Sequence, residues 1–165
     1  MLAVIQEEKV AFGIDPRVTE VLGLCEKAEF ACAELYHHFA ALFKDEREIF
    51  HLWLRTALEE ENRARLFALV GKLRHDNIIA SVELELAEAE QALLHIRSVL
   101  ERVKEHPPTV RESLEIGIEI EVKLDRLMTQ NVVIFTEESY EKSFLAIINS
   151  RHLESLREAF RELTV

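Results

Sequence analysis

The stretch SLEIGIEIEVKL, residues 113–124, decides the fold because its apolar residues fit two different periods. With a period of two, one face of a β-strand would carry four branched residues: Ile116, Ile118, Ile120 and Val122. With the helical period of 3.6, a single apolar stripe would contain Leu114, Gly117, Ile118, Leu124 and Met128. Glu121 lies in the middle of that stripe. The helical interpretation therefore points a carboxylate at the protein core.

The composition favours a helical protein. The chain has 165 residues, enough for one core, but only four glycines and three prolines from which to build turns. We therefore predict an all-α fold in which residues 1–165 form a single domain.

The charge and the apolar runs exclude two classes of function. A net charge of -11 argues against a nucleic-acid or acidic-membrane binder, since both need a basic surface. No apolar run approaches the roughly 18–20 residues of a membrane span, and the N-terminal stretch MLAVIQEEKVAFG lacks a basic region and a cleavage site. We expect a cytoplasmic protein that binds neither nucleic acid nor membrane.

Cys25 and Cys32 are the only cysteines in the sequence. Seven residues along one helix separate their Cα atoms by about 10 Å, which is too far for a disulfide. Without a second pair, a four-cysteine zinc or rubredoxin-type iron site is excluded. We interpret both cysteines as small buried apolar residues.

Stripes and capping residues predict five helices and no sheet. The first helix follows the N-cap Asp15 and runs from Pro16 to about Phe43. The second, capped by Asp45, covers about residues 46–73. A third covers residues 81–105 in heptad register, and the following Pro107 and Pro108 stop it.

Two further helices complete the prediction. Thr109 caps the fourth, which reaches about Thr129, and the fifth begins within residues 136–139 and continues to about Leu163. Two antiparallel hairpins need a long return connection, and 25 helical residues span about 37 Å. Residues 81–106 are therefore predicted to be a helical crossover along the bundle. Their heptads also offer a surface for a second copy, so we expect a homodimer.

Charged or polar residues interrupt the apolar stripes of four helices: Glu29, Glu60, Glu121 and His152. An uncompensated buried carboxylate is strongly unfavourable. For one glutamate alone, a half-exposed position at the stripe edge is a sufficient explanation. Four such residues near the middles of four helices favour a metal site, because carboxylates and imidazole bind iron, manganese and zinc.

Two parts of the chain resemble a known family. Residues 29–69, EFACAELYHHFAALFKDEREIFHLWLRTALEEENRARLFAL, resemble the first half of a rubrerythrin-like member of the ferritin-like superfamily. The stretches SLEIGIEIEVKLDRLM and LAIINSRHLESL resemble its second hairpin, and the similarity covers roughly residues 18–75 and 110–163. The resemblance implies a four-helix bundle of two antiparallel hairpins joined by a long helical crossover. In that family each hairpin supplies a Glu and a Glu-x-x-His motif, which together hold two iron atoms.

The first hairpin keeps two of its three implied ligands. Glu29 matches the first-helix glutamate, and Glu60 matches the glutamate of the Glu-x-x-His motif. Arg63 stands where the histidine is expected. A register shifted by one residue uses Glu59 and Asn62 and also lacks the histidine.

The second hairpin also keeps two ligands. Glu121 matches the first-helix glutamate and His152 the histidine, whereas Asn149 replaces the motif's glutamate. The metal ligands implied by the resemblance are thus Glu29, Glu60, Glu121 and His152. We do not expect a full di-iron centre, since ligands for a second metal are depleted and no cysteine set delivers electrons.

Two functional hypotheses follow. Arginine does not bind metals, but the Arg63 guanidinium could replace a metal's positive charge through bidentate hydrogen bonds to the carboxylates. In the main hypothesis the bundle is metal-free and non-catalytic and serves binding or assembly. In the alternative a single Fe, Zn or Mn ion at the residual site serves redox or iron handling. Tyr36 could be a hydrogen-bond partner of a core carboxylate in either case.

Overall fold

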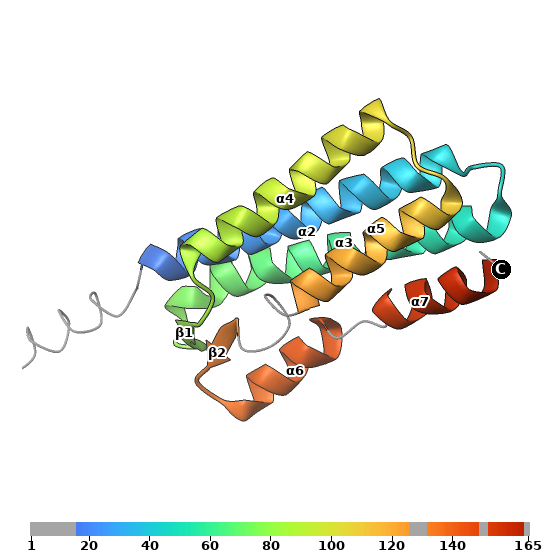
Figure 1. Cartoon of the computed structure of the whole chain (residues 1–165). Coiled ribbons are helices and arrows are strands. Elements are labelled where there is room, and N and C mark those ends of the chain that lie inside the picture. Colours follow the sequence, from blue (N-terminus) through green and yellow to red (C-terminus); the bar gives the residue numbers. More distant parts are fainter. Residues whose placement is uncertain (1–15, 126–131, 149–151, 164–165) are drawn as a thin grey trace, which may run out of the picture.

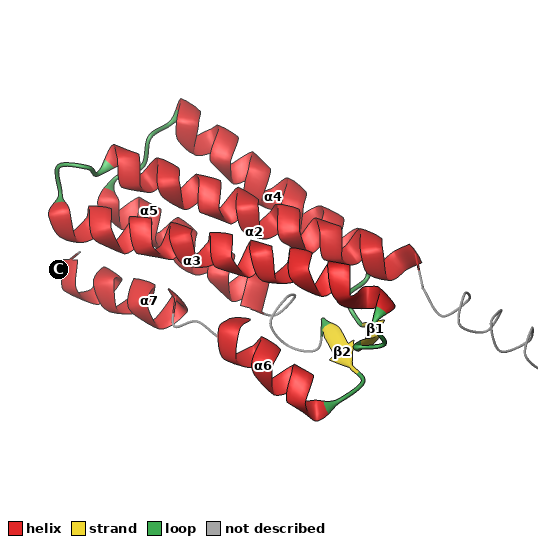
Figure 2. Cartoon of the chain, turned by 180° about the vertical axis from the view of Figure 1, so that it is seen from behind, coloured by secondary structure: helices red, strands yellow, loops and turns green. Residues whose placement is uncertain are grey.

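The computed structural model describes residues 16–125, 132–148 and 152–163, which are mostly helical. The elements follow in the order α2 (Pro16–Leu42), α3 (Arg47–Lys72), the 3-10 turn η1 (Leu73–His75), β1 (Ile79–Val82), α4 (Leu86–Glu105), α5 (Val110–Leu124), β2 (Val133–Phe135), α6 (Glu138–Ile148) and α7 (His152–Leu163). The predicted all-α class is confirmed for the main body of the protein (Figure 2).

The long helices lie side by side along one axis (Figure 1). α2 and α3 form an antiparallel hairpin with the largest contact in the molecule, and α4 returns along α2 to the end where α5 begins. α5 then runs back and packs against α7, while α6 packs against α3. These helices enclose one core, and α4 connects the α2–α3 hairpin to α5.

The opening stretch is a helix, as predicted. Thr109 caps α5 with a capping box, in which its side chain accepts a hydrogen bond from the Glu112 backbone N–H and the Glu112 carboxylate binds the Thr109 N–H. The buried positions repeat every three or four residues: Ser113, Leu114, Gly117, Ile120, Glu121 and Leu124. Ile120 takes the buried place predicted for Ile118, which is half-buried. Met128 lies outside the described residues.

The prediction that no sheet would form is wrong. β1 and β2 pair antiparallel, with Ile79 opposite Phe135 and Val82 opposite Val133. Both segments are rich in branched and aromatic residues, which favour strands over helices. The signal was present in the run VVIF at residues 132–135. β1 includes residues 81 and 82 of the predicted crossover, so the helical part begins at Leu86.

One predicted helix boundary also needs correction. The predicted fifth helix corresponds to α6, described up to Ile148, and α7, described from His152, and residues 149–151 lie outside the described residues. α3 has Glu46 rather than Asp45 at its N-cap, without a side-chain capping hydrogen bond. The predicted end of the fourth helix near Thr129 lies outside the described residues.

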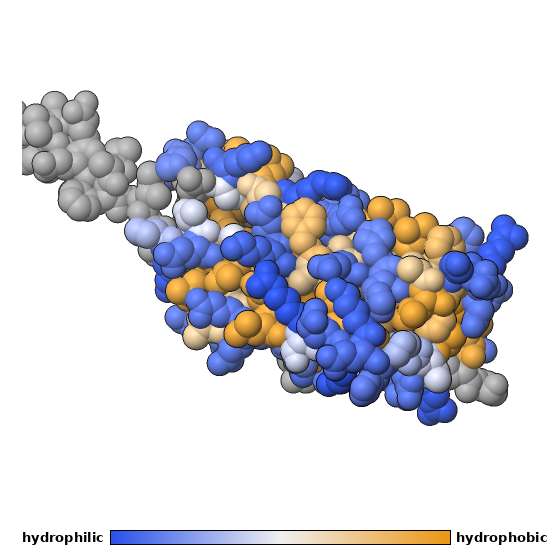
Figure 3. All heavy atoms as spheres, turned by 90° about the horizontal axis from the view of Figure 1, so that it is seen from above, coloured by the Kyte–Doolittle hydropathy of each residue, from blue (hydrophilic) through white to orange (hydrophobic). Residues whose placement is uncertain are grey.

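The surface of the bundle is dominated by polar side chains. Viewed from above, where α4 lies, hydrophilic side chains surround smaller hydrophobic groups (Figure 3). Leu94 on α4 is the most exposed large apolar residue among the described residues, with an exposed fraction of 64%. Within the described residues no helix combines the length and the apolar character needed to cross a membrane.

A close contact between α5 and α3 requires a glycine in the core. A Cβ atom on Gly117 would lie 2.6 Å from Cη2 of Trp53 and 3.3 Å from Cδ1 of Leu156. The Trp53 ring is fully buried between Tyr36 and Phe39, with ring centroids 5.1 Å and 4.9 Å away. The ring has little freedom to retreat, so Gly117 sets how closely the helices approach.

We predict that Gly117→Ala lowers the free energy of unfolding by roughly 1–3 kcal/mol, because the added methyl group overpacks the core. Gly23 is the matched control, since it lies within α2 and a Cβ there would have nothing within 4 Å. Gly23→Ala should stabilise the protein by about 0.5–1 kcal/mol through helix propensity. Chemical denaturation measures both changes, and equal effects of the two substitutions would contradict the packing argument.

Candidate metal centre

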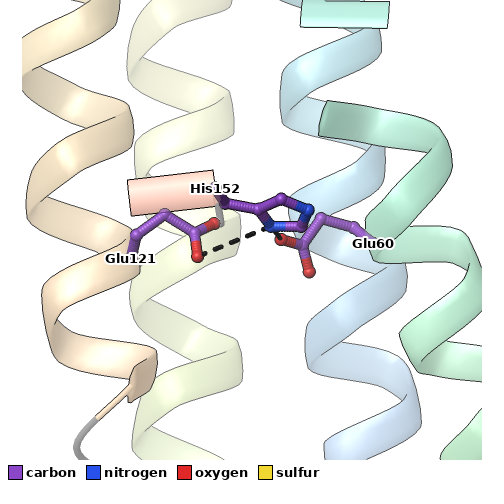
Figure 4. A group of neighbouring side chains, drawn as sticks. All are labelled: Glu60, Glu121 and His152. Carbon is purple, nitrogen blue, oxygen red and sulfur yellow. Dashed lines mark ion pairs between the residues drawn. The ribbon is translucent and has the colours of Figure 1, made fainter. Parts of the chain in front are cut away.

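The four predicted ligand residues are all buried, and each comes from a different helix. Glu29 lies on α2, Glu60 on α3 and Glu121 on α5, while His152 is the first residue of α7. Their exposed fractions are between 0% and 3%. One potential ligand atom from each of Glu60, Glu121 and His152 lies within 4.8 Å of the others (Figure 4). Three of the four residues therefore converge closely enough to hold one metal ion.

Glu29 lies outside this group of three but beside it. Burial raises the pKa of Glu29 well above its ordinary value of 4.5, and the neighbouring Glu60 carboxylate raises it further. The positive charge of Arg63 acts in the opposite direction. Glu29 therefore lies next to the convergent group and interacts electrostatically with its charged residues.

The His152 ring lies between carboxylates on both of its edges. Nδ1 is 2.7 Å from Oε1 of Glu60 and 3.9 Å from Oε2 of Glu121 (Figure 4). Nε2 contacts Oε2 of Glu59, whose side chain is 40% exposed. One ring nitrogen thus faces the buried carboxylates, and the other faces a carboxylate at the surface.

Several buried polar atoms of this group have short contacts but no well-directed hydrogen bond. Among the described residues these atoms are both Glu60 oxygens, both His152 ring nitrogens and Oε2 of Glu29. Buried polar atoms in proteins are nearly always satisfied, by protein, water or an ion. A cation would accept electron pairs from Glu60 and from one ring nitrogen of His152, so these atoms fit a metal ligand set.

Arg63 supplies positive charge to the same core. Its Nη1 lies 3.5 Å from Oε1 of Glu60 and 3.8 Å from Oε2 of Glu121. Its hydrogen bonds go elsewhere: Nε and Nη2 both donate to the backbone carbonyl of Ile148, at 3.0 Å and 2.7 Å. The expected ion pairs exist, but the bidentate hydrogen bonds expected with carboxylates are instead made with the last carbonyl of α6.

Tyr36 is a hydrogen-bond partner of the cluster, as the sequence suggested. Its hydroxyl donates to Oε1 of Glu121 over 2.8 Å. Burial, followed by the charge of Glu121, raises the pKa of Tyr36 well above its ordinary value, so the phenol keeps its proton. One oxygen of Glu121 is thereby occupied, and Oε2 is the oxygen that faces His152.

The carboxyl groups of the cluster have opposite pKa shifts. Burial and the Glu60 charge raise the pKa of Glu121, as they do for Glu29. Burial also acts to raise the pKa of Glu60, but the contacts with Glu29 and His152 and the charge of Arg63 lower it below its ordinary value. The surroundings of Glu60 thus favour its ionised form beside the guanidinium, while those of Glu29 and Glu121 favour the protonated forms.

Both cysteines are buried free thiols, as predicted. Burial raises the pKa of Cys25 to about 12. Burial and the nearby Glu60 also raise the pKa of Cys32. Cys32 therefore borders the cluster as a protonated, apolar neighbour rather than as a thiolate ligand.

The structure decides between the two registers on α3. Glu60 and Arg63 are buried, whereas Asn62 is exposed and Glu59 is half-exposed. Sequence reasoning missed two partners in the site. Glu59 lies about 100° from Glu60 around the helix, so the sequence spacing could have indicated a second carboxylate near the site. The Ile148 carbonyl is a backbone group, and no side-chain pattern signals it.

Comparisons of the chain with protein-family models, with curated proteins and with solved structures give no match. The function is therefore argued from the geometry of the site.

We predict that Arg63→Met, which keeps much of the side-chain volume, strongly destabilises the metal-free protein near pH 7. Deleting one partner of a buried charge pair typically costs roughly 3–5 kcal/mol, and the Ile148 carbonyl also loses its donor. The loss should be smaller in mild acid, where the carboxylates can take up protons. Thermal and urea unfolding in the presence of a chelator measure it.

Arg65→Met is the matched control for Arg63→Met. Arg65 lies on the same helix, but its side chain is 65% exposed and pairs with Glu61 at the surface. Exposed pairs contribute about 0–1 kcal/mol. If Arg63→Met proves no more damaging than Arg65→Met, Arg63 is not the counter-charge of the core.

Proposed function

We propose that this protein binds one divalent transition-metal ion, Fe²⁺, Mn²⁺ or Zn²⁺, inside a ferritin-like helical bundle. Glu60, Glu121 and His152 would hold the ion, with Glu29 beside it. This is the metal-binding alternative of the sequence analysis, in which the bound ion serves iron handling or redox chemistry. Mixed carboxylate and imidazole ligands suit these metals better than Ca²⁺ or Mg²⁺.

The observation that carries the proposal is the convergence of three buried side chains with unsatisfied atoms. Their ligand atoms lie within 4.8 Å of one another, and both atoms that Glu60 and His152 each offer have no well-directed partner among the described residues. Three protein ligands leave coordination positions for water or a small substrate. The two antiparallel hairpins and the return helix α4 are the arrangement that the rubrerythrin resemblance implies, which supports the family assignment as part of this proposal.

Charge balance supports one ion rather than two. Three ionised carboxylates are neutralised by one divalent ion together with the Arg63 guanidinium. A second divalent ion would leave the site with excess positive charge, and arginine offers it no ligand. The positive charge of Arg63 therefore replaces the positive charge that a second metal ion would supply.

A second candidate function is the metal-free bundle of the main sequence hypothesis, used for binding or assembly. It is favoured by the opposite pKa shifts, since raised pKa values at Glu29 and Glu121 favour their neutral forms and a lowered pKa at Glu60 favours an anion opposite Arg63. The predicted homodimer belongs with either candidate. Leu94 on α4, 64% exposed, supplies an apolar contact for it.

We predict that the purified protein binds about one equivalent of Zn²⁺, Mn²⁺ or anaerobic Fe²⁺ per chain, and that binding raises the melting temperature. The double variant Glu60→Gln/His152→Gln should lose this binding. Elemental analysis after desalting and thermal melting at several metal concentrations measure both effects.

The matched control is a second Glu–His pair, with its glutamate on α3 next to Glu60 and its histidine on α2. His37 and Glu61 lie 2.8 Å apart, but they are only partly buried and far less enclosed. Glu61→Gln/His37→Gln should bind the metal like the unmodified protein. If no metal binds after loading with any of the three ions, the metal-free candidate replaces the proposal.

We predict that the metal-free protein loses stability as the pH rises from about 4.5, the ordinary pKa of a glutamate. Glu29 and Glu121 have raised pKa values when folded, so between 4.5 and those values the folded state holds more protons than the unfolded state. The free energy of unfolding then falls with increasing pH. Glu60, with a lowered pKa, acts in the opposite direction below pH 4.5.

Urea denaturation between pH 4.5 and 8 with a chelator tests this dependence. Glu121→Gln should flatten it, because the glutamine does not titrate. Glu119→Gln is the control, since Glu119 is exposed on the same helix and pairs with Lys123. In the unmodified protein, added metal should also release about one to two protons, because ligands must be deprotonated. A pH-independent stability would contradict the assigned protonation states.

A further inference from the structure

His152 contacts an additional carboxylate that is not among the proposed ligands. Oε2 of Glu59 contacts Nε2 of the ring, on the edge away from the buried carboxylates. Glu59 directly precedes Glu60 on α3, and the two side chains diverge by about 100°. The same helix therefore supplies one carboxylate to each edge of a single imidazole.

The two carboxylates differ in their surroundings. The Glu59 side chain is 40% exposed, whereas Glu60 is fully buried. Oε1 of Glu59 lies 4.0 Å from Nε of the exposed Arg55, so its two oxygens have separate partners. Glu59 is a poor candidate for the metal, but it is well placed to accept a proton from Nε2.

We propose that Glu59 is the positioning residue of the metal centre: it holds the proton of His152 on Nε2 and thereby directs Nδ1 at the ion. This inference rests on the proposed function. Imidazole binds a metal through a nitrogen without a proton, and the hydrogen bond made by the other nitrogen decides which one that is. Nδ1 is the nitrogen within 2.7 Å of Glu60 and 3.9 Å of Glu121.

A carboxylate on Nε2 has two effects on the centre. It fixes the ring against rotation about the bond that joins it to Cβ, so that Nδ1 stays directed at Glu60 and Glu121. It also makes the imidazole a stronger electron donor through the shared proton. Loss of such a partner typically weakens metal binding roughly 10–100-fold.

Long-range ¹H–¹⁵N NMR of the imidazole nitrogens, with and without Zn²⁺, tests the inference. In the zinc-loaded protein, zinc is expected on Nδ1 and a proton on Nε2. Glu59→Ala should make the Nε2 proton exchange faster and weaken Zn²⁺ binding roughly 10–100-fold. Glu59→Gln, whose amide oxygen still accepts a hydrogen bond, should restore most of both. Glu61→Gln, which removes the carboxylate of the His37–Glu61 pair, should change neither.

Several results would overturn the positioning role. These are zinc bound through Nε2, or an Nε2 proton of the zinc-loaded protein that is unchanged in Glu59→Ala. A Glu59→Ala variant whose metal-free melting temperature falls while its zinc affinity is kept would show a structural role instead. Failure of the unmodified protein to bind Zn²⁺, with a Glu59-dependent Nε2 proton, would overturn the proposed function and leave the positioning role in place.

Discussion

The contact between the Arg63 guanidinium and the Ile148 carbonyl is the constraint on which the core depends. Nε and Nη2 of Arg63 both donate to this carbonyl, which belongs to the last residue of α6. The same guanidinium lies near Glu60 and Glu121. One side chain thus binds a backbone carbonyl of α6 inside the protein and places a positive charge beside two carboxyl groups.

This arrangement allows two neutral states of the same core. In one, Glu60 alone is ionised opposite Arg63, and the raised pKa values of Glu29 and Glu121 favour their protonated forms. In the other, all three carboxylates are ionised and a divalent cation supplies the remaining charge. Exchange of protons for a cation therefore avoids an uncompensated buried charge, which is the most expensive state of such a site. The proposed function is thus consistent with the charge balance of both the metal-free and the cation-bound core.

The sequence predicted what depends on local pattern. The stripes of α2, α3, α4 and α5, the stop at Pro107, the capping box of Thr109 and the inward direction of Glu121 all follow from residue spacing. The missed features depend on distant partners. β1 and β2 are separated by 50 residues in sequence. The Arg63 side chain binds the backbone carbonyl of Ile148, which is 85 residues away. Such a carbonyl carries no sequence signal, so the geometry of Arg63 could not be predicted.

Arg63 serves the backbone and the carboxylates at the same time. A histidine at position 63 would match the resemblance, but its shorter ring offers one donor in a fixed direction, where the guanidinium donates twice to the Ile148 carbonyl. The histidine would also remove the permanent positive charge that lies near Glu60 and Glu121. Replacing Arg63 by a potential metal ligand therefore changes both the partner of a buried carbonyl and the charge balance of the core.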